Sequence, residues 1–256
     1  MCFCKITSIF VFKSVYISMN SKKISVCMAT YNGGQYIKEQ IESILVQLKD
    51  DDELIISDDG STDDTLNIIS SFNDHRIKIY NNENRKGVVG NFENAMMKCT
   101  GDIIFLSDQD DVWLPNKIEV SVKYLKNNEV VVTDCVVVND GLQIISESYF
   151  KISNSRKGFF KNFYRSSYLG CCLAFEKEVL NDILPIPKSL YLYHDWWIGF
   201  IVDKKYRVKF VDVPCMLFRR HQSNTSTTAG VSKQSFYKKI RDRFQLLYLG
   251  TIRLLK

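Results

Sequence analysis

The sequence predicts a Rossmann-like α/β domain, built on a mostly parallel central sheet with helices on both faces. Apolar segments of strand length alternate with segments of helical periodicity from residue 24 to residue 138. The composition, with 45% hydrophobic and 25% charged residues in a chain of 256, is typical of a globular domain and excludes a disordered or collagen-like chain. The length suits one large domain, or one domain with an added lobe.

Each expected strand is a short run bounded by polar residues. The first, ISVCMA, is continuously apolar, as in a strand that is buried on both faces of a sheet. The third, RIKIY, alternates instead between apolar and polar residues. In chain order, strands are expected at 24–29, 53–57, 76–80, 102–106 and 129–138.

Spacing and end signals predict the helices between these strands. Apolar residues recur at helical spacing within 34–48. Ser61 with Asp64 resembles a capping box, which would open a helix that reaches about residue 71. Another helix is expected at 88–98, and Pro115 fits the first residue of a helix that ends near residue 127.

Beyond residue 140 the alternation becomes irregular. Helix signals remain at 175–183 and 195–203, with a short strand at 206–211, and the basic segment 232–256 is again helical. Residues 1–18 are expected to be an extension outside the fold. Their apolar middle is short, Lys13 interrupts it, and no small-residue cleavage site follows.

Cysteine usage and missing motifs exclude several classes of protein. None of the eight cysteines has the two-residue spacing of a zinc ribbon or a thioredoxin-type site, so we expect buried free thiols in a reducing cytoplasm. No stretch approaches the roughly 18 apolar residues that a membrane span requires. No G-x-G-x-x-G follows the first strand and no Walker A motif occurs, which argues against a dinucleotide dehydrogenase and a P-loop NTPase.

Polar residues follow three of the expected strands, at the edge where ligands of open α/β sheets bind. Carboxylates brought together there repel one another unless a cation joins them. Oxygen ligands at the spacing of Asp108 and Asp110 suit Mg²⁺ or Mn²⁺, which usually bring phosphates with them. Acids also favour turns and helix N-termini, the interpretation that we prefer for Asp63 and Asp64. The residues in question are Thr30, Tyr31 and Asn32 after the first strand, Asp58 and Asp59 after the second, and Asp108, Gln109, Asp110 and Asp111 after the fourth.

Four sequence blocks resemble, in order, the nucleotide-binding half of glycosyltransferase family 2. They are TYNGGQYIKEQIESI, IISDDGSTDDT, NRKGVVGNFENAM and GDIIFLSDQDDVWLPNK. The resemblance covers residues 24–125, and DQDDVW looks like the D-x-D motif of the family.

The second half of the chain resembles the family at three shorter places. YLGCCLAF at 168–175 looks like the acceptor-side glycine segment, and YHDWW at 193–197 lies where the family carries its catalytic acid. FRRHQSN at 218–224 resembles the R-x-H-x-x-N element near the metal and the diphosphate. The combination is most similar to bacterial rhamnosyltransferase-type members, although the family more often has Glu-Asp where this chain has His194 and Asp195.

This resemblance implies a GT-A fold with an acceptor-side lobe. It implies inverting, metal-dependent transfer from a nucleotide-diphosphate sugar, UDP- or dTDP-linked, to a saccharide or lipid-linked acceptor. The product would belong to a surface polysaccharide such as capsule, O-antigen or exopolysaccharide, made in the cytoplasm or at the inner face of the cell membrane. The GT-A domain would span 19–230, with the donor half at 24–125, the acceptor half at 126–230 and a basic helix at 231–256.

The resemblance also implies a role for each matching residue. Asp195 would be the general base, Asp58 would recognise the nucleotide base, and Asp108 would bind the ribose. Mn²⁺ or Mg²⁺ would be held by Asp110 and His221 with Asp108. Contacts to the nucleotide sugar are expected from Thr30, Tyr31, Asn32, Asp58, Asp59, Lys86, Asp108, Gln109 and Arg219, and contacts to the acceptor from Gly170, Cys171, His194, Trp196 and Trp197.

Less specific interpretations remain open at this point. Asp195 could only cap a helix that begins at Trp196, His221 could only order its loop, and both tryptophans could be core residues. A sugar nucleotidyltransferase would need a basic residue in its Gly-rich loop, which NGGQY lacks. A further alternative is a family-like domain that binds the nucleotide sugar and has lost catalysis.

The C-terminal segment combines apolar and basic residues. Phe236, Ile240, Phe244, Leu247 and Ile252 lie near one face of the expected helix, and Lys238, Lys239, Arg241, Arg243 and Arg253 interrupt or flank that face. Such a helix either lies on an anionic membrane surface or packs against the domain with its charges in solvent, and both remain open. The formal net charge of +5 comes without a nucleic-acid-binding motif, so no nucleic-acid partner is expected.

Overall fold

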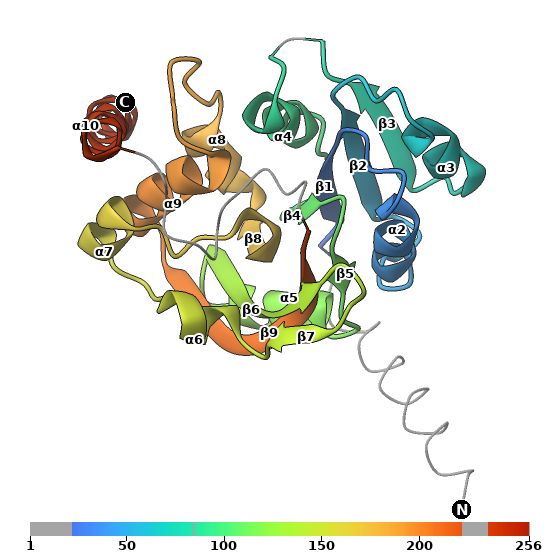
Figure 1. Ribbon diagram of the computed structural model, residues 1–256. Helices are drawn as coiled ribbons and strands as arrows, with labels where there is room; N and C mark the ends of the chain where they lie inside the picture. The colour runs from blue at the N-terminus through green and yellow to red at the C-terminus, as the bar shows by residue number, and fades with distance from the viewer. Residues whose placement is uncertain (1–21, 84, 222–234, 256) are drawn as a thin grey trace, which may run out of the picture.

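The computed structural model describes residues 22–83, 85–221 and 235–255. The expected extension at 1–18 therefore lies outside the described residues. A nine-stranded sheet runs through the domain in the order β3-β2-β1-β4-β8-β6-β9-β5, and β7 pairs with β6 (Figure 1). No helix in these described ranges is long and apolar enough to cross a bilayer.

The first half of the sheet is parallel, as the alternation of elements predicts. Its strands are β1 (Ile24–Thr30), β2 (Glu53–Asp58), β3 (Ile77–Asn81) and β4 (Ile103–Asp108). The helices are α2 (Ile37–Leu45), α3 (Thr65–Ser71), α4 (Val88–Met97) and α5 (Lys117–Leu125). Figure 1 shows α2 and α3 on one face of these strands and α4 on the other, so helices cover both faces.

The second half of the sheet mixes strand directions. β8 (Leu173–Glu176) lies antiparallel between β4 and β6 (Val130–Asn139), and β9 (Val208–Arg220) then runs parallel to β6. The short strands β5 (Val112–Trp113) and β7 (Ile144–Ser146) are antiparallel to their neighbours. Register shifts in the β6–β9 pair mark irregular pairing within this second half.

The remaining helices lie beside this second half. They are α6 (Tyr149–Ser153), α7 (Phe159–Tyr164), α8 (Leu180–Ile183), α9 (His194–Lys205) and α10 (Phe236–Leu254), with short 3-10 turns at Gly170–Cys172 and Lys177–Val179. The predicted helices at 195–203 and 232–256 are thereby confirmed within the described residues.

Some predicted boundaries are wrong for local reasons. Ser61 does not form a capping box, because its hydroxyl donates to Asp58 Oδ1 over 2.5 Å and α3 begins only at Thr65. Pro115 precedes α5 by two residues instead of opening it. The expected helix at 175–183 begins as strand β8, and the short strand expected at 206–211 extends to residue 220.

The core lies between the sheet and its covering helices. Strands β1, β2 and β4 are almost entirely buried, as their continuous apolar runs predict. The six cysteines in the described part of the chain are all free, and all except the half-buried Cys99 are buried. Within these residues the prediction of free thiols is confirmed.

Candidate active site

Acidic residues gather where β4 ends, at the carboxyl edge of the parallel strands. Asp108 is the last residue of β4, and Asp110 and Asp111 lie in the short loop that leads to β5. Asp110 Oδ2 lies 2.8 Å from His221 Nε2, and both side chains are largely buried. Two of the three residues expected to hold a metal are therefore in direct contact, although the sequence separates them by 111 positions.

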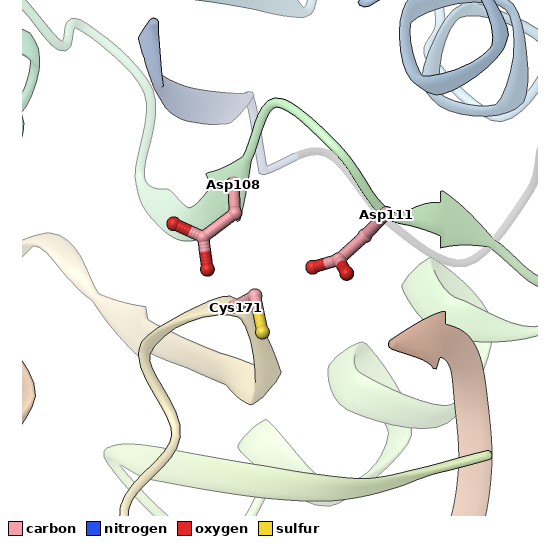
Figure 2. A group of neighbouring side chains, drawn as sticks. All are labelled: Asp108, Asp111 and Cys171. Carbon is pink, nitrogen blue, oxygen red and sulfur yellow. The ribbon is translucent and has the colours of Figure 1, made fainter. Parts of the chain in front are cut away.

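A second group beside this loop consists of two carboxylates and a thiol. Ligand atoms of Asp108, Asp111 and Cys171 all lie within 4.8 Å of one another, and Figure 2 shows the three side chains close together. Burial and the neighbouring carboxylates raise the pKa of Asp108 to about 7 and the pKa of Asp111 well above its usual range. Asp111 Oδ1 accepts the backbone N–H of Arg219 over 3.0 Å, whereas Oδ2 has no nitrogen or oxygen donor among the described residues.

Asp195 lies in the first turn of α9, close to this acidic edge. Burial raises its pKa to about 7, and the charge of Asp195 in turn raises the pKa of Asp108. The helix begins at His194, so Asp195 is not the cap of a helix that begins at Trp196, and that alternative is wrong. Asp195 Oδ1 still accepts the Trp196 N–H over 2.8 Å, which fixes the orientation of the carboxylate.

His194 is enclosed beside the acceptor-side glycine segment. Its ring stacks on Phe92 with the ring centroids 4.1 Å apart, and neither ring nitrogen has a hydrogen-bond partner among the described residues. Burial lowers the pKa of His194 to about 3, so the imidazole is neutral. A Cβ atom on Gly170 would lie 2.6 Å from His194 Nε2, so only glycine leaves room for this ring.

The two tryptophans after Asp195 differ in their surroundings. Trp197 is fully buried, and its indole N–H donates to Ile183 O over 2.8 Å, so the structure places this residue in the core. Trp196 is partly exposed, and the guanidinium of Arg243 lies 3.8 Å from its ring centroid. Arg243 comes from α10, so the last helix covers part of this ring.

The loops after β1 and β2 hold each other through buried side chains. Thr30 donates to Asp58 Oδ1 over 3.0 Å, and Asp58 Oδ2 accepts the backbone N–H groups of Gly60 and Ser61. Because both carboxylate oxygens of Asp58 are occupied and the residue is 1% exposed, this side chain closes the turn instead of facing a ligand. Asn32 has a left-handed φ of 48°, and its side chain accepts the Thr62 N–H over 2.8 Å.

Gln109 connects the loop after β4 to the loop after β1. Its amide oxygen accepts the Tyr31 N–H over 2.9 Å, and its amide nitrogen donates to Tyr31 O over 3.1 Å. The side chain of Tyr31 remains 56% exposed above this pair. Gln109 therefore positions the backbone of Tyr31, a role that the motif alone does not reveal.

Lys86 approaches the same edge from the loop before α4. Its ammonium group donates to Asp59 O over 3.1 Å and to Asn82 O over 2.9 Å, and the side chain is 65% exposed. Asp59 also accepts the Gly87 N–H over 2.7 Å. Lys86 is thus the exposed cation of the donor-side loops, next to the half-buried carboxylate of Asp59.

Arg219 has a buried guanidinium that makes three hydrogen bonds inside the protein. It donates to Glu39 Oε2 over 2.5 Å, to Asp110 O over 2.8 Å and to Asp140 O over 2.7 Å. It also lies 4.9 Å from the ring centroid of Tyr36. Arg219 thus holds the acidic loop in place.

Sequence reasoning missed several residues that support this edge. Lys117 is a buried lysine whose ammonium group donates to Cys171 O over 2.8 Å and lies 4.9 Å from the ring centroid of Trp113. Tyr36 donates to Asp140 Oδ1 over 2.6 Å, and its ring centroid lies 4.8 Å from that of His221. Lys117, Tyr36 and Glu39 all fall inside the quoted sequence blocks, which is the one signal that could have identified them.

A family model described as "Glycosyl transferase family 2" matches residues 25–184. The dTDP-rhamnosyl transferase RfbG of Shigella flexneri is 30% identical over 237 residues, which cover 83% of this chain and 78% of RfbG. The UDP-Glc:alpha-D-GlcNAc-diphosphoundecaprenol beta-1,3-glucosyltransferase WfgD of Escherichia coli is 28% identical over 214 residues, which cover 82% of this chain and 81% of WfgD.

A crystal structure of S. aureus TarS in complex with UDP has the same fold. The two chains superpose with a TM-score of 0.65 at 22% sequence identity, over 88% of this chain and 65% of the TarS chain. At this identity the likeness concerns the fold alone, and it confirms the predicted GT-A architecture.

Proposed function

The chain belongs to glycosyl transferase family 2 and is a glycosyltransferase, and from this premise we propose the reaction that its acidic edge performs. The enzyme transfers a sugar from a UDP- or dTDP-linked donor to a hydroxyl group of a saccharide or lipid-linked acceptor, with inversion at the anomeric carbon. The observation that carries this proposal is the convergence of Asp110, His221, Asp108 and Asp195 from three separate segments at one edge of the sheet.

The residues at this edge fit a hard divalent cation. Asp110 and His221 offer a carboxylate oxygen and an imidazole nitrogen 2.8 Å apart, and Asp108 lies two residues before Asp110 at the end of β4. Carboxylate oxygens suit Mn²⁺ or Mg²⁺, whereas the thiol of Cys171 suits softer metals. We therefore assign the metal to Asp110 and His221 with Asp108, and a structural role to Asp111. When bound, the cation would neutralise the charge that develops on the departing diphosphate.

Asp195 is the residue that we assign as general base. A pKa of about 7 keeps a substantial fraction of the carboxylate deprotonated near neutral pH and makes it a stronger base than an exposed aspartate. In the proposed step, Asp195 accepts the proton of the acceptor hydroxyl while that oxygen attacks the anomeric carbon from the side opposite the diphosphate. The bond between the sugar and the diphosphate breaks, and the leaving group carries away the electron pair.

Donor recognition is assigned to the exposed groups of the donor-side loops. Tyr31, Asn32, Asp59 and Lys86 have accessible surface beside the edge, and the ammonium group of Lys86 would face negative charge on the donor. These loops are held by the hydrogen bonds, described above, of Thr30, Asp58, Gln109 and Arg219. We assign the latter four as positioning residues for nucleotide binding.

Acceptor recognition is assigned to the opposite side of Asp195. The neutral ring of His194 against Gly170, with Cys171 beside it and part of Trp196 exposed, forms the wall nearest the base. RfbG and WfgD are named for dTDP-rhamnosyl transfer and for glucosyl transfer to a diphosphoundecaprenol-linked sugar. By analogy, we propose that this chain extends a lipid-linked saccharide in surface polysaccharide synthesis, and its free thiols support a reducing cytoplasmic compartment.

The proposal is tested by donor binding and transfer measured on the same protein. A panel of UDP- and dTDP-sugars with Mn²⁺ should raise the melting temperature selectively, and one of them should release its diphosphate when acceptor is added. The Asp195→Asn variant should keep the Mn²⁺-dependent donor shift and lose transfer. If the donor raises the melting temperature of the wild-type protein but no transfer occurs, the domain binds nucleotide sugar without catalysis.

A further inference from the structure

The last helix, α10, turns one apolar face away from the domain, whereas Leu246 packs in the core. Tyr237 is 85% exposed, Phe244 68% and Tyr248 67%. These three positions are separated by seven and four residues, so they occupy one face of the helix. The exposed apolar residues on this face are Tyr237, Ile240, Phe244, Leu247, Tyr248, Ile252 and Leu255. An ordinary surface helix of a globular protein buries such a face.

The opposite side of α10 binds the domain through polar contacts. Arg253 donates to Asp182 O and Leu184 O over 2.9 and 2.8 Å, and Gln245 Oε1 accepts the Tyr191 N–H over 3.0 Å. Leu246 and Asp242 on this side are fully buried. These bonds leave Arg253 half-buried against the domain. These directed hydrogen bonds set the rotation of the helix and leave the apolar face outside.

A neighbouring helix extends this apolar face. Phe160 and Tyr164, one turn apart on α7, are 83% and 81% exposed. The guanidinium of Arg243 on α10 donates to Tyr164 O over 3.1 Å, which joins the two helices at their edges. We call the exposed apolar residues of α10 together with Phe160 and Tyr164 the α7–α10 face.

The charge around the α7–α10 face is positive. Within Phe236–Leu254 the basic residues apart from Arg253, which binds the domain, are Lys238, Lys239, Arg241 and Arg243, and the one acidic residue, Asp242, is buried. On the α7 side, burial and the charges of Arg165 and Arg156 lower the pKa of Lys161 to about 8, which shows that several cations lie close together. Aromatic and aliphatic side chains flanked by cations match the interface of an anionic bilayer, where the apolar groups enter the acyl boundary and the cations face the head groups.

We propose that the α7–α10 face is an interfacial docking surface for an anionic phospholipid membrane. The inference depends on this surface and not on the identity of the acceptor, so it stands independently of the proposed reaction. Helix α9 contacts both α7 and α10 and carries Asp195 at its first turn, so membrane docking would hold the base near lipid-linked acceptors.

The test is cosedimentation of the full chain with vesicles. We expect binding to phosphatidylcholine vesicles that contain about one third phosphatidylglycerol, weak binding to pure phosphatidylcholine, and loss of binding at about 0.5 M salt. Phe244→Ser combined with Tyr248→Ser should lower the bound fraction at least ~10-fold, because two of the three exposed rings of the helix are removed. Both positions are exposed, so circular dichroism should be unchanged.

A matched control removes exposed apolar groups from other helices of the protein. Val46 and Met97 are 75% and 63% exposed on the donor half, and Val46→Ser with Met97→Ser should leave vesicle binding as in the wild type. Equal binding of the Phe244/Tyr248 variant and the wild type would overturn the proposal. A second result would also overturn it: the wild type does not bind anionic vesicles but forms a dimer, and the Phe244/Tyr248 substitutions dissociate that dimer. The face would then bind a second copy of the chain. Transfer to a water-soluble acceptor should be unaffected, which separates this test from that of the reaction.

Discussion

Replacing Asp195 with asparagine should abolish sugar transfer while preserving the fold. The half-buried carboxylate accepts the Trp196 N–H, and an asparagine amide has the same shape and an oxygen that can accept the same bond. Removal of a positioned general base typically lowers a rate about 10²–10⁴-fold. We expect kcat to fall about 10³-fold, with donor binding nearly unchanged because the proposed role of Asp195 concerns the acceptor hydroxyl and not the donor.

The same substitution should change the pH dependence of stability in a defined direction. The usual pKa of 3.8 is raised to about 7 in the folded protein, so the folded chain holds a proton through this pH range that the unfolded chain has lost. Stability therefore falls as pH rises through this window, by up to about 4 kcal/mol at roughly 1.4 kcal/mol per pH unit. Asparagine cannot ionise, so the variant should be more stable than wild type near pH 8 and similar to it below about pH 4.

Two measurements on one set of proteins test this reasoning. Release of nucleoside diphosphate should rise with pH through about 7 in the wild type and should be low and flat in the variant. Urea unfolding at about pH 5 and about pH 8 gives the stability difference. Asp212→Asn removes an exposed carboxylate from β9 and should change neither quantity. A variant that retains more than about a tenth of wild-type kcat would refute Asp195 as the base, and a flat wild-type pH profile would refute its raised pKa.

Three further substitutions probe the surrounding structure. His221→Ala should remove most of the Mn²⁺-dependent rise in melting temperature with donor, and an unchanged rise would exclude His221 as a ligand. Gly170→Ala should lower the free energy of unfolding by about 1–3 kcal/mol, because the Cβ of the alanine would lie 2.6 Å from His194 Nε2. An unchanged free energy of unfolding would show that the ring of His194 moves freely. Arg219→Lys should lower the free energy of unfolding by about 2–4 kcal/mol and weaken donor binding, because a lysine lacks the planar group that bonds Glu39, Asp110 and Asp140 at once. An unchanged free energy of unfolding would contradict the positioning role of Arg219.

The donor half could be predicted almost completely from the sequence. Continuous apolar runs identify β1, β2 and β4, and helical spacing identifies α2 and α4, because both signals depend on residues a few positions apart. Parallel connections then place the polar residues after each strand at one edge. The prediction that acids converge on this edge follows from topology alone.

The second half was less predictable because its contacts are long-range. Strand β8 is four residues long and lies antiparallel between two strands that are earlier in the chain, which no local pattern indicates. Its sequence also continues directly into helical turns, so the segment 175–183 carries a mixed signal. Register in such a sheet is decided by packing between the strands and not by the propensity of either one.

Individual side chains at the site show the same difference between what a local pattern predicts and what long-range contacts decide. The motifs predict Asp110 and His221 as partners, and the structure brings them to 2.8 Å. The motifs equally suggest Asp58 and Arg219 as ligand contacts, but both are occupied by internal hydrogen bonds. Residue type and spacing identify a polar group near a site, whereas burial and competing partners decide whether that group is available.

The sequence by itself determined the class of fold, the order of the elements and the edge at which the acids meet, because periodicity and strand ends are local properties. Only the tertiary structure decided that α10 presents its apolar face outward, that Trp197 belongs to the core, and that Arg219 is buried behind the acidic loop. A helical pattern shows which side chains share a face but contains nothing about the direction of that face. That direction depends on partners such as Asp182 and Leu184, about seventy residues away in the chain, whose carbonyl groups bind Arg253.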